Sequence, residues 1–390
     1  MPSRAKVTAV HDELACRQHR MKLQAVELRR IEMPLIAPFR TSFGTQVMRD
    51  VLLLRAITDG CEGWGECCAP TEPLYSSEYV DGCEHVIRRH LLPRLFEAPQ
   101  LDAARVGEIL SPVQGHRMAK AALEMAVLDA ELRARSEPFA RHLGAVRETV
   151  DCGVSVGIEE SIQRLLEVVD GYLTEGYRRI KLKIEPGWDV EPVRALRERL
   201  PDVMLQVDAN AAYTLADARH LARLDEFDLV LIEQPLPEEQ LRAHAELAAQ
   251  LATPICLDES IVSASAAADA IALGACSIVS VKPSRVGGYL EARRVHDVCQ
   301  AHGVPVWCGG MLETGLGRAG NVALAALPGF ALPGDISASD RYYRQDITEP
   351  FVLEDGRLRV PAGPGLGVTV DEAVLREVTT SVDLVTRPDR

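Results

Sequence analysis

The sequence contains no run of 18 or more consecutive apolar residues, so we expect no membrane-spanning helix. It also has no excess of basic residues, because 43 Lys and Arg stand against 57 Asp and Glu, a formal net charge of −14. Binding to nucleic acid requires a basic surface, so this balance argues against a nucleic-acid partner. Residues 1–20 carry no apolar signal-peptide core, and we expect a leader or disordered tail before a start at either Met1 or Met21.

Paired metal-binding cysteines are missing as well. The ten cysteines include no Cys-x-x-Cys motif, and the adjacent Cys67 and Cys68 suit neither a zinc site nor a disulfide. We therefore expect reduced, mostly buried thiols in a cytoplasmic protein. A glycine-rich phosphate loop, which is common after the first strand of a doubly wound sheet, is also absent.

The first third of the chain predicts a small α+β domain. Residues 23–58 alternate apolar and polar side chains, as in an antiparallel sheet with one packed face. Helical periodicity follows over residues 77–95, 102–110 and 118–135. We assign residues 21–150 to this domain.

The middle of the chain repeats a short apolar run, a polar endpoint and an amphipathic stretch. The runs span residues 154–157, 180–183, 205–208, 230–233, 254–258, 278–282 and 304–308. Their endpoints recur every 24 or 25 residues from Lys183 to Lys282. Eight such units fill a parallel barrel, so with residues 330–335 as the eighth strand region we predict a (β/α) TIM-type barrel over 151–345.

The tail, residues 346–390, carries a hairpin signal. Two short apolar segments, 351–353 and 358–360, flank Asp355-Gly356, a dipeptide typical of a two-residue turn. We expect this tail to return to the N-terminal sheet, so that both ends of the chain build the smaller domain.

Polar side chains end five consecutive strands of the predicted barrel. In chain order they are Lys183, Asp208, Glu233, Asp258 and Lys282. Strand ends meet at the mouth of a barrel, and three carboxylates cannot all stay ionised there without a cation. Because their donors are all oxygen, Asp208, Glu233 and Asp258 predict a site for Mg²⁺ or Mn²⁺ rather than zinc.

The lysines predict acid–base chemistry. Lys181 and Lys183 are two residues apart on one strand and therefore face the same way. A neighbouring ammonium and a divalent cation disfavour a charged lysine, so we expect its pKa to be lowered toward the range of a usable base. Lys282 lies three strands further round, across the mouth. With a metal to stabilise the enediolate, such a site suits removal of a proton α to a carboxylate.

Longer strings at these positions resemble the enolase superfamily, in particular its o-succinylbenzoate synthase / N-acylamino acid racemase branch. The resemblance covers residues 21–374 and rests on the segments 177–183 (YRRIKLK), 208–210 (DAN), 233–236 (EQPL), 258–260 (DES), 282–288 (KPSRVGG), 307–313 (WCGGMLE) and 335–342 (DISASDRY). It implies a modified (β/α)7β barrel with a capping domain and a homo-oligomeric assembly.

The resemblance also implies roles for individual residues. Lys183 is the principal base, and Lys282 is the acid or base on the opposite face in racemisation or a cation against the ring in the synthase reaction. Supporting or substrate-binding positions, among them the capping loop 39–44, are Lys181, Asn210, Ser155, Arg285, Met311, Leu312, Glu313, Phe43 and Tyr75.

The function implied is dehydration of 2-succinyl-6-hydroxy-2,4-cyclohexadiene-1-carboxylate, a step toward menaquinone, with racemisation of N-succinyl or other N-acyl amino acids in the same site. A dedicated racemase and a muconate cycloisomerase are the alternatives. The segment 307–313 lacks the histidine base of a mandelate-racemase type, and Asp335 is not followed by the Asp-x-Asp pattern of dipeptide epimerases. A non-enzymatic barrel is disfavoured because all three carboxylates and both lysines are present.

Overall fold

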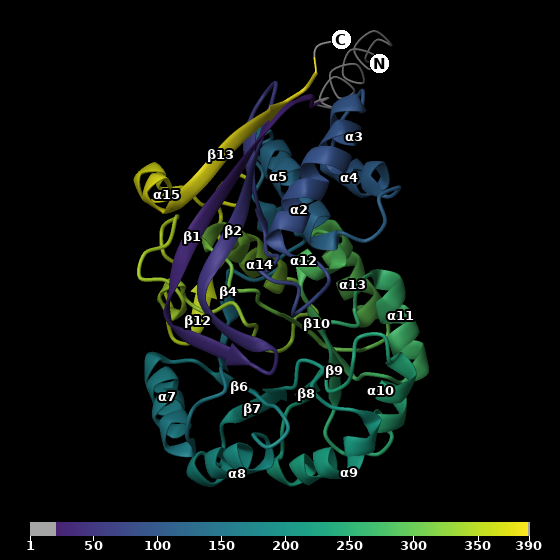
Figure 1. The fold of residues 1–390 in the computed structure, drawn as a ribbon, viewed down its shortest axis with the longest axis vertical. Helices are drawn as coiled ribbons and strands as arrows, with labels where there is room; N and C mark the ends of the chain where they lie inside the picture. Colours follow the sequence, from purple (N-terminus) through teal and green to yellow (C-terminus); the bar gives the residue numbers. More distant parts are fainter. Residues whose placement is uncertain (1–20, 389–390) are drawn as a thin grey trace, which may run out of the picture.

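The computed structural model describes residues 21–388 and consists of a capping domain above a barrel (Figure 1). Four antiparallel strands form the capping sheet in the order β13-β1-β2-β3. Their bounds are β1 Leu23–Thr41, β2 Gly44–Thr58, β3 Glu62–Cys67 and β13 Thr379–Thr386. The tail of the chain thus pairs with the first strand, through contacts such as Val26 with Val385.

Helices cover one face of this sheet. They are α2 Val80–Val86, α3 Leu92–Glu97, α4 Ala103–Leu110, α5 Arg117–Ala134 and α6 Phe139–Leu143, with a π-helical turn at Ile87–Leu91. Strand β3 packs directly on α5, where a Cβ at Gly63 or Gly65 would lie 2.1 Å from helix backbone atoms. Only glycine permits that approach, which joins the sheet firmly to its helix.

Strands β1 and β2 together span the strand-like region predicted over residues 23–58. Their pairing continues to Thr41 opposite Gly44, so residues 39–44 form the tip of a hairpin rather than the expected loop. The tip reaches down to the barrel mouth (Figure 1). There Ser42 Oγ donates to the carbonyl oxygen of Ala209 at 3.2 Å, and the Ile158 amide donates to that of Arg40 at 2.9 Å.

Seven parallel strands form the barrel sheet, each hydrogen-bonded to the next in chain order. They are β5 Gly153–Val156, β6 Arg179–Lys183, β7 Met204–Asp208, β8 Ile232–Glu233, β9 Ile255–Leu257, β10 Ile278–Val281 and β11 Val306–Cys308. The predicted eighth segment, 330–335, closes the ring, because it bridges to β11 through Val306–Phe330 and to the start of β5 through Cys152–Gly334. The predicted barrel with its capping domain is confirmed.

Helices connect the barrel strands on the outside. They are α7 Ile162–Glu175, α8 Val190–Arg199, α9 Ala218–Leu221, α10 Leu241–Ala248, α11 Ala264–Leu273, α12 Pro283–Val286, α13 Tyr289–Ala301 and α14 Gly315–Ala325, with 3₁₀ turns at Leu215–Asp217, Ala222–Phe227 and Ser339–Arg341. Serine side chains begin two of them, since Ser161 Oγ accepts from the Arg164 amide and Ser263 Oγ from that of Ala266, both at 3.1 Å. Within residues 21–388, no helix has the length and apolar character needed to cross a membrane.

The predicted hairpin in the tail forms only in part. Glu354 and Arg357 exchange backbone hydrogen bonds of 2.9 Å around Asp355-Gly356, both in the left-handed region, so the turn is correct. Residues 351–353 are not a strand, however. The second arm, β12 Arg357–Arg359, pairs instead with β4 Thr149–Asp151, and the chain returns to the capping sheet later through α15 Glu372–Val378 and β13.

Candidate active site

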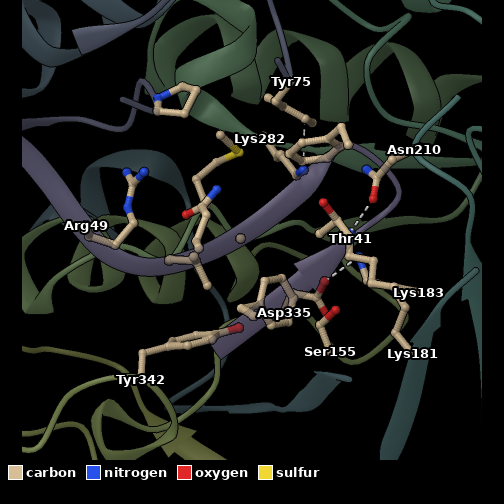
Figure 2. Close-up of a pocket in the computed structure, with 17 residues that line it drawn as sticks. Thr41, Arg49, Tyr75, Ser155, Lys181, Lys183, Asn210, Lys282, Asp335 and Tyr342 are labelled. Carbon is tan, nitrogen blue, oxygen red and sulfur yellow. Dashed lines mark hydrogen bonds and ion pairs between the residues drawn. The ribbon is translucent and has the colours of Figure 1, made fainter. Parts of the chain in front are cut away.

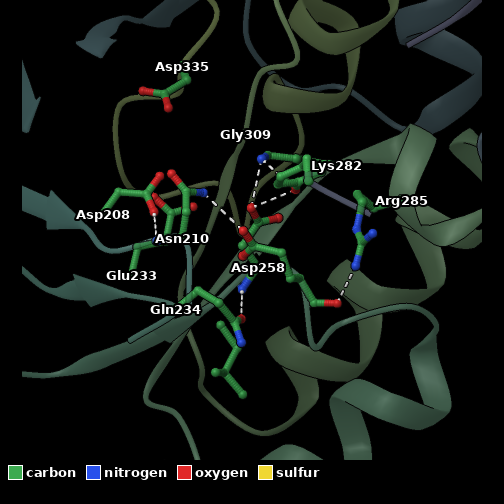
Figure 3. A network of polar contacts seen from close by, with 12 residues as sticks. Asp208, Asn210, Glu233, Gln234, Asp258, Lys282, Arg285, Gly309 and Asp335 are labelled. Carbon is green, nitrogen blue, oxygen red and sulfur yellow. Dashed lines mark hydrogen bonds and ion pairs between the residues drawn. The ribbon is translucent and has the colours of Figure 1, made fainter. Parts of the chain in front are cut away.

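Backbone pairing brings the predicted strand-end residues to one rim. Lys183, Asp208 and Glu233 are the last residues of β6, β7 and β8, and the register aligns Lys183 with Asp208 and Asp208 with Glu233. Asp258 and Lys282 follow directly after β9 and β10. Figure 3 shows the carboxylates of this rim with Lys282 beside Asp258. The strand-end residues, which are equally spaced in the sequence, therefore lie close together at this rim.

Each lysine of the rim is buried against carboxylates. Lys181 Nζ lies 3.1 Å from Asp208, 2.7 Å from Glu233 and 2.5 Å from Asp335. Lys183 Nζ donates to Asp208 at 2.6 Å and to the Asn210 side-chain oxygen at 2.7 Å. On the same strand, both amines point toward the same side, as predicted from their spacing.

Lys282 belongs to a second group of contacts. Its Nζ lies 2.7 Å from Asp258 and 3.0 Å from the Tyr75 hydroxyl, and it sits 4.9 Å from the centre of the Tyr75 ring. Tyr75 itself donates to Asp258 at 3.0 Å. The capping domain thus supplies a hydrogen-bonding partner to a residue at the end of a barrel strand.

The pKa values of Lys181 and Lys282 are set mainly by burial and by the carboxylates around them. Burial lowers the pKa of Lys181, but Asp335, Glu233 and Asp208 raise it well above its ordinary value. Burial likewise lowers the pKa of Lys282, while Asp258 and other acidic neighbours raise it. In the protein alone, close carboxylates outweigh both burial and the second ammonium, and the lowering expected beside a divalent cation stays a prediction.

The crowded carboxylates have the donor chemistry of a hard-cation site. Burial and then Asp208 raise the pKa of Glu233, and burial with Asp258 raises that of Glu259 to about 8. Buried oxygens without a hydrogen-bond partner remain on Glu233 (Oε1), Asp258 (Oδ1) and Glu259 (Oε2). Such oxygens fit a divalent cation that accepts only oxygen ligands.

The three expected ligands do not, however, converge on one point. Within the described part of the chain, no three His, Cys, Asp or Glu side chains are arranged to hold a metal ion. Asp208 and Glu233 share the ammonium of Lys181, whereas Asp258 pairs with Lys282. The donor types fit a divalent cation, and the amines lie where positive charge balances the carboxylates.

A cavity opens between the rim and the hairpin tip (Figure 2). Nine of the predicted site residues line it: Phe43, Tyr75, Ser155, Lys181, Lys183, Asn210, Lys282, Met311 and Leu312. Phe43 and Tyr75, both of the capping domain, contact each other with ring centroids 5.8 Å apart and face barrel residues such as Lys183 and Lys282 across the cavity.

Five predicted residues do not line the cavity: the rim carboxylates Asp208, Glu233 and Asp258, and also Arg285 and Glu313. The Arg285 guanidinium is buried, donates to Glu238 at 2.6 Å and stacks 5.3 Å from the centre of the Tyr75 ring. Glu313 accepts a hydrogen bond from the Asn321 side chain at 2.9 Å. Arg285 therefore reaches the cavity through Tyr75, and Glu313 belongs to the packing beneath it.

Strained backbone gathers at the strand ends. Asn210, Ala211, Gln234 and Leu312 all have positive φ, between 37° and 61°. Asn210 nevertheless holds two site residues, since its side chain accepts from Lys183 and donates to Glu259 at 3.0 Å. Positive φ in non-glycine residues costs energy and is concentrated at functional sites, in agreement with this location.

Several lining residues were missed by sequence reasoning. Asp335 ends the closing segment 330–335 and contacts both Lys181 and Arg179, so the strand-end rule used for the other carboxylates also selects it. The others come from the hairpin and neighbouring loops, where no periodicity marks them. They are Gln46, Arg49, Pro70, Gly310 and Tyr342, whereas Phe39 and Thr41 belong to the expected capping loop 39–44.

Two family models match the chain. Residues 25–144 match the mandelate racemase / muconate lactonizing enzyme N-terminal domain, and residues 164–374 match the enolase C-terminal domain-like model. The boundary between the matches falls where the capping domain gives way to the first barrel strands.

Individual proteins are similar over nearly their whole length. An N-succinylamino acid racemase from an Amycolatopsis species is 69% identical over 93% of this chain and 98% of its own. An o-succinylbenzoate synthase from Geobacillus kaustophilus is 46% identical over 94% and 98%. A crystal structure of an enolase superfamily member from Listeria innocua superposes with a TM-score of 0.91, at 40% identity over 94% and 100%. A Rhodococcus opacus muconate cycloisomerase is more distant, at 27% over 90% and 96%.

Proposed function

We propose that this chain, which belongs to the enolase superfamily, is an o-succinylbenzoate synthase that also racemises N-succinylamino acids. Both reactions begin with removal of a proton from the carbon next to a carboxylate. The observation that carries the proposal is the placement of two buried amines, those of Lys183 and Lys282, on one cavity bordered by acidic strand ends. The two amines come from strands on different sides of the rim.

We assign the cation site to the acidic rim. Enolase superfamily enzymes generally use a divalent metal, and here Asp208, Glu233 and Asp258 would hold Mg²⁺ or Mn²⁺, with Asn210 in support. The bound ion would neutralise substrate carboxylate charge and stabilise the enediolate. The unpartnered oxygens of Glu233 and Asp258 support this assignment, because buried charged oxygens otherwise require hydrogen bonds.

The protein's own groups move the proton. In the synthase reaction, Lys183 Nζ takes the proton from the carbon bearing the carboxylate. In a syn elimination the hydroxyl leaves from the same face, so the new ammonium of Lys183 can return the proton to it and release water. Lys282 remains a cation beside the ring, a role in accord with the raised pKa that Asp258 and its other acidic neighbours give it.

Racemisation uses the same two amines differently. One lysine removes the α-proton of an N-succinylamino acid, and the lysine across the cavity delivers a proton to the opposite face. No other group has to change, since the carboxylate and the acyl tail occupy the same places in both reactions. The 69% identity to a protein named a racemase favours a dedicated racemase as the second candidate.

The proposal also includes a substrate class, a cellular compartment and an assembly for the enzyme. Its partner is a small carboxylate substrate with a succinyl or other acyl group. We assign it to the cytoplasm, and the nine described cysteines, all free thiols, support a reducing compartment. A homo-oligomer is also proposed, supported by the exposed Val382 and Leu384 on the edge strand β13.

Purified protein with Mg²⁺ tests the proposal directly. We expect dehydration of the cyclohexadiene carboxylate, followed by its ultraviolet absorbance, and racemisation of an N-succinylamino acid, followed by polarimetry. Turnover of the amino acid alone would leave the dedicated racemase. Turnover of neither, with ring closure of a muconate, would replace the proposal by muconate cycloisomerisation.

A further inference from the structure

Four cationic side chains line the cavity, and they differ in their partners. Lys181, Lys183 and Lys282 each lie within 3.1 Å of at least one carboxylate. Arg49, on β2 of the capping hairpin, does not. Among residues 21–388 its guanidinium has no carboxylate partner, although Arg49 is only 2% exposed.

The contacts of Arg49 leave most of its hydrogen-bonding capacity unused. Nη2 donates to the carbonyl oxygen of Cys68 at 3.3 Å, a long bond, and the buried Nε has no partner within the described chain. A guanidinium has five N–H donors in a planar fork. Burying such a charge without an anion is costly, so binding of an anionic ligand would stabilise this arginine.

The acidic groups closest to this region are already engaged. Glu66 accepts from the backbone and hydroxyl of Thr314 and from the Gly317 amide, at 2.7 to 3.0 Å. Glu313 accepts from the Asn321 side chain. Within residues 21–388, neither of these two carboxylates pairs with Arg49.

Arg49 also lies away from the catalytic amines. Figure 2 shows it at the left of the cavity, with Lys183 and Asn210 at the right. Gln46, on the same strand, lines the cavity and has a buried side-chain oxygen without a partner. A second polar end of the cavity is thus formed by the capping hairpin, distinct from the rim where the proton is moved.

We propose that Arg49 binds the terminal carboxylate of the substrate's succinyl group, with Gln46 beside it. The inference rests on the proposed function and adds to it the group that selects a dicarboxylate over a neutral acyl chain. The substrate's other carboxylate lies at the acidic rim, and the carbon next to it loses the proton. The terminal carboxylate pairs with the planar guanidinium, whose fork matches the two carboxylate oxygens.

The test compares two substrates that differ only in that terminal group. N-succinyl-phenylalanine carries the carboxylate, and N-succinamoyl-phenylalanine carries an amide of the same shape in its place. We expect the parent protein with Mg²⁺ to racemise the first with about 100-fold higher kcat/KM, because an unmatched buried charge is costly. Arg49→Met should reduce this preference to less than about threefold, mainly through KM, and Arg49→Lys should retain part of it.

A matched control lies on the same strand. Arg55 does not line the cavity and pairs with Glu27, so Arg55→Met should keep the full preference for the succinyl substrate. Equal losses on both substrates in Arg49→Met, without rescue by lysine, would show that Arg49 only supports the fold and would overturn the proposal.

If Arg49→Met does not fold, the parent protein alone still tests whether the cavity selects an anionic acyl group. Equal turnover of the two substrates by the parent would exclude an anion-selecting Arg49 while leaving the proposed function intact. Turnover of neither substrate would refute the proposed racemase activity, and the assignment of Arg49 would fall with it.

Discussion

The barrel rim and the capping hairpin border the same cavity but are built by different rules. The rim residues end consecutive parallel strands, so backbone pairing fixes both their spacing in sequence and their closeness in space. The hairpin residues Thr41, Phe43, Gln46 and Arg49 come from one antiparallel ribbon whose tip is held against the barrel by Ser42 and Arg40. The positions of the rim residues follow from the strand repeat in the sequence. The positions of the hairpin residues depend on how the capping domain packs on the barrel.

The two regions also differ in charge balance. At the rim, each amine is paired with carboxylates, and the pKa values of Lys181 and Glu233 are both raised. On the hairpin, the Arg49 guanidinium is buried without an acidic partner among residues 21–388. This contrast assigns proton transfer to the rim and recognition of the acyl tail to the hairpin. Changes in the two regions should therefore have different kinetic signatures.

The largest expected effect is at the rim. Lys183→Ala should lower kcat of both reactions by about 10⁴-fold, because loss of a positioned base removes the proton acceptor. Steady-state assays of each reaction measure this. Lys22→Ala, which removes an exposed lysine of the capping domain, is the control and should match the parent. Retention of more than a tenth of the activity in Lys183→Ala would mean that another group is the base.

A smaller effect is expected on metal affinity. Glu233→Gln removes one charged oxygen from the acidic rim and should weaken Mg²⁺ binding by about 10- to 100-fold, as measured by calorimetric titration. The exposed Glu226→Gln on the outside of the barrel serves as its control. Unchanged affinity in Glu233→Gln would remove this residue from the metal site.

At the hairpin tip, Phe43→Ala should raise KM about tenfold and change kcat less than about threefold. The ring packs on Tyr75 and covers the cavity, so its loss removes about 1.4 kcal/mol of contact with the bound acyl group. Val47→Ala alters an exposed side chain on the same hairpin and should have no effect. A fall in kcat comparable to that of a rim variant would break the division between the two regions.

Glu66 joins the capping sheet to the barrel, and changing it should affect turnover least. The expected effect is on stability. Glu66 of β3 accepts hydrogen bonds from the start of α14, and burial raises its pKa to about 7. A carboxyl whose folded pKa exceeds its unfolded value of 4.5 loses stability as pH rises from 4.5 to 7. The loss amounts to about 3 kcal/mol.

Glu66→Gln cannot ionise, so its unfolding free energy should fall less than that of the parent over this range. Denaturant unfolding at pH 4.5, 6 and 7.5 measures the difference. Parallel curves for the two proteins would show that Glu66 does not carry this pH dependence.

The rim was predictable because a strand-end residue in a parallel barrel has a defined position. The steps from Lys183 to Lys282 determined which side chains meet, and the same rule would have found Asp335 had the closing segment been treated like the other strands. Helices with clear periodicity, such as α4 and α5, also lie close to their predicted bounds.

The hairpin could not be predicted in this way. The alternation over residues 23–58 predicts the strands, but it does not indicate that their tip at Thr41 and Gly44 lies against the barrel mouth. Arg49 is one basic residue among 43, and only the assembled domains show that it is buried without an acidic partner. The tail similarly contained a correct turn signal but gave no indication that β12 pairs with β4.

The most direct test of the two-amine site follows exchange of the α-proton in D₂O with each enantiomer of N-succinyl-phenylalanine separately. Mass spectrometry or proton NMR measures deuterium incorporation for the parent, Lys183→Ala and Lys282→Ala. We predict that the parent exchanges both enantiomers, that each variant still exchanges one, and that the two variants retain opposite enantiomers. Loss of the same enantiomer in both variants, or exchange of both by either one, would contradict a site with one amine on each face of the substrate.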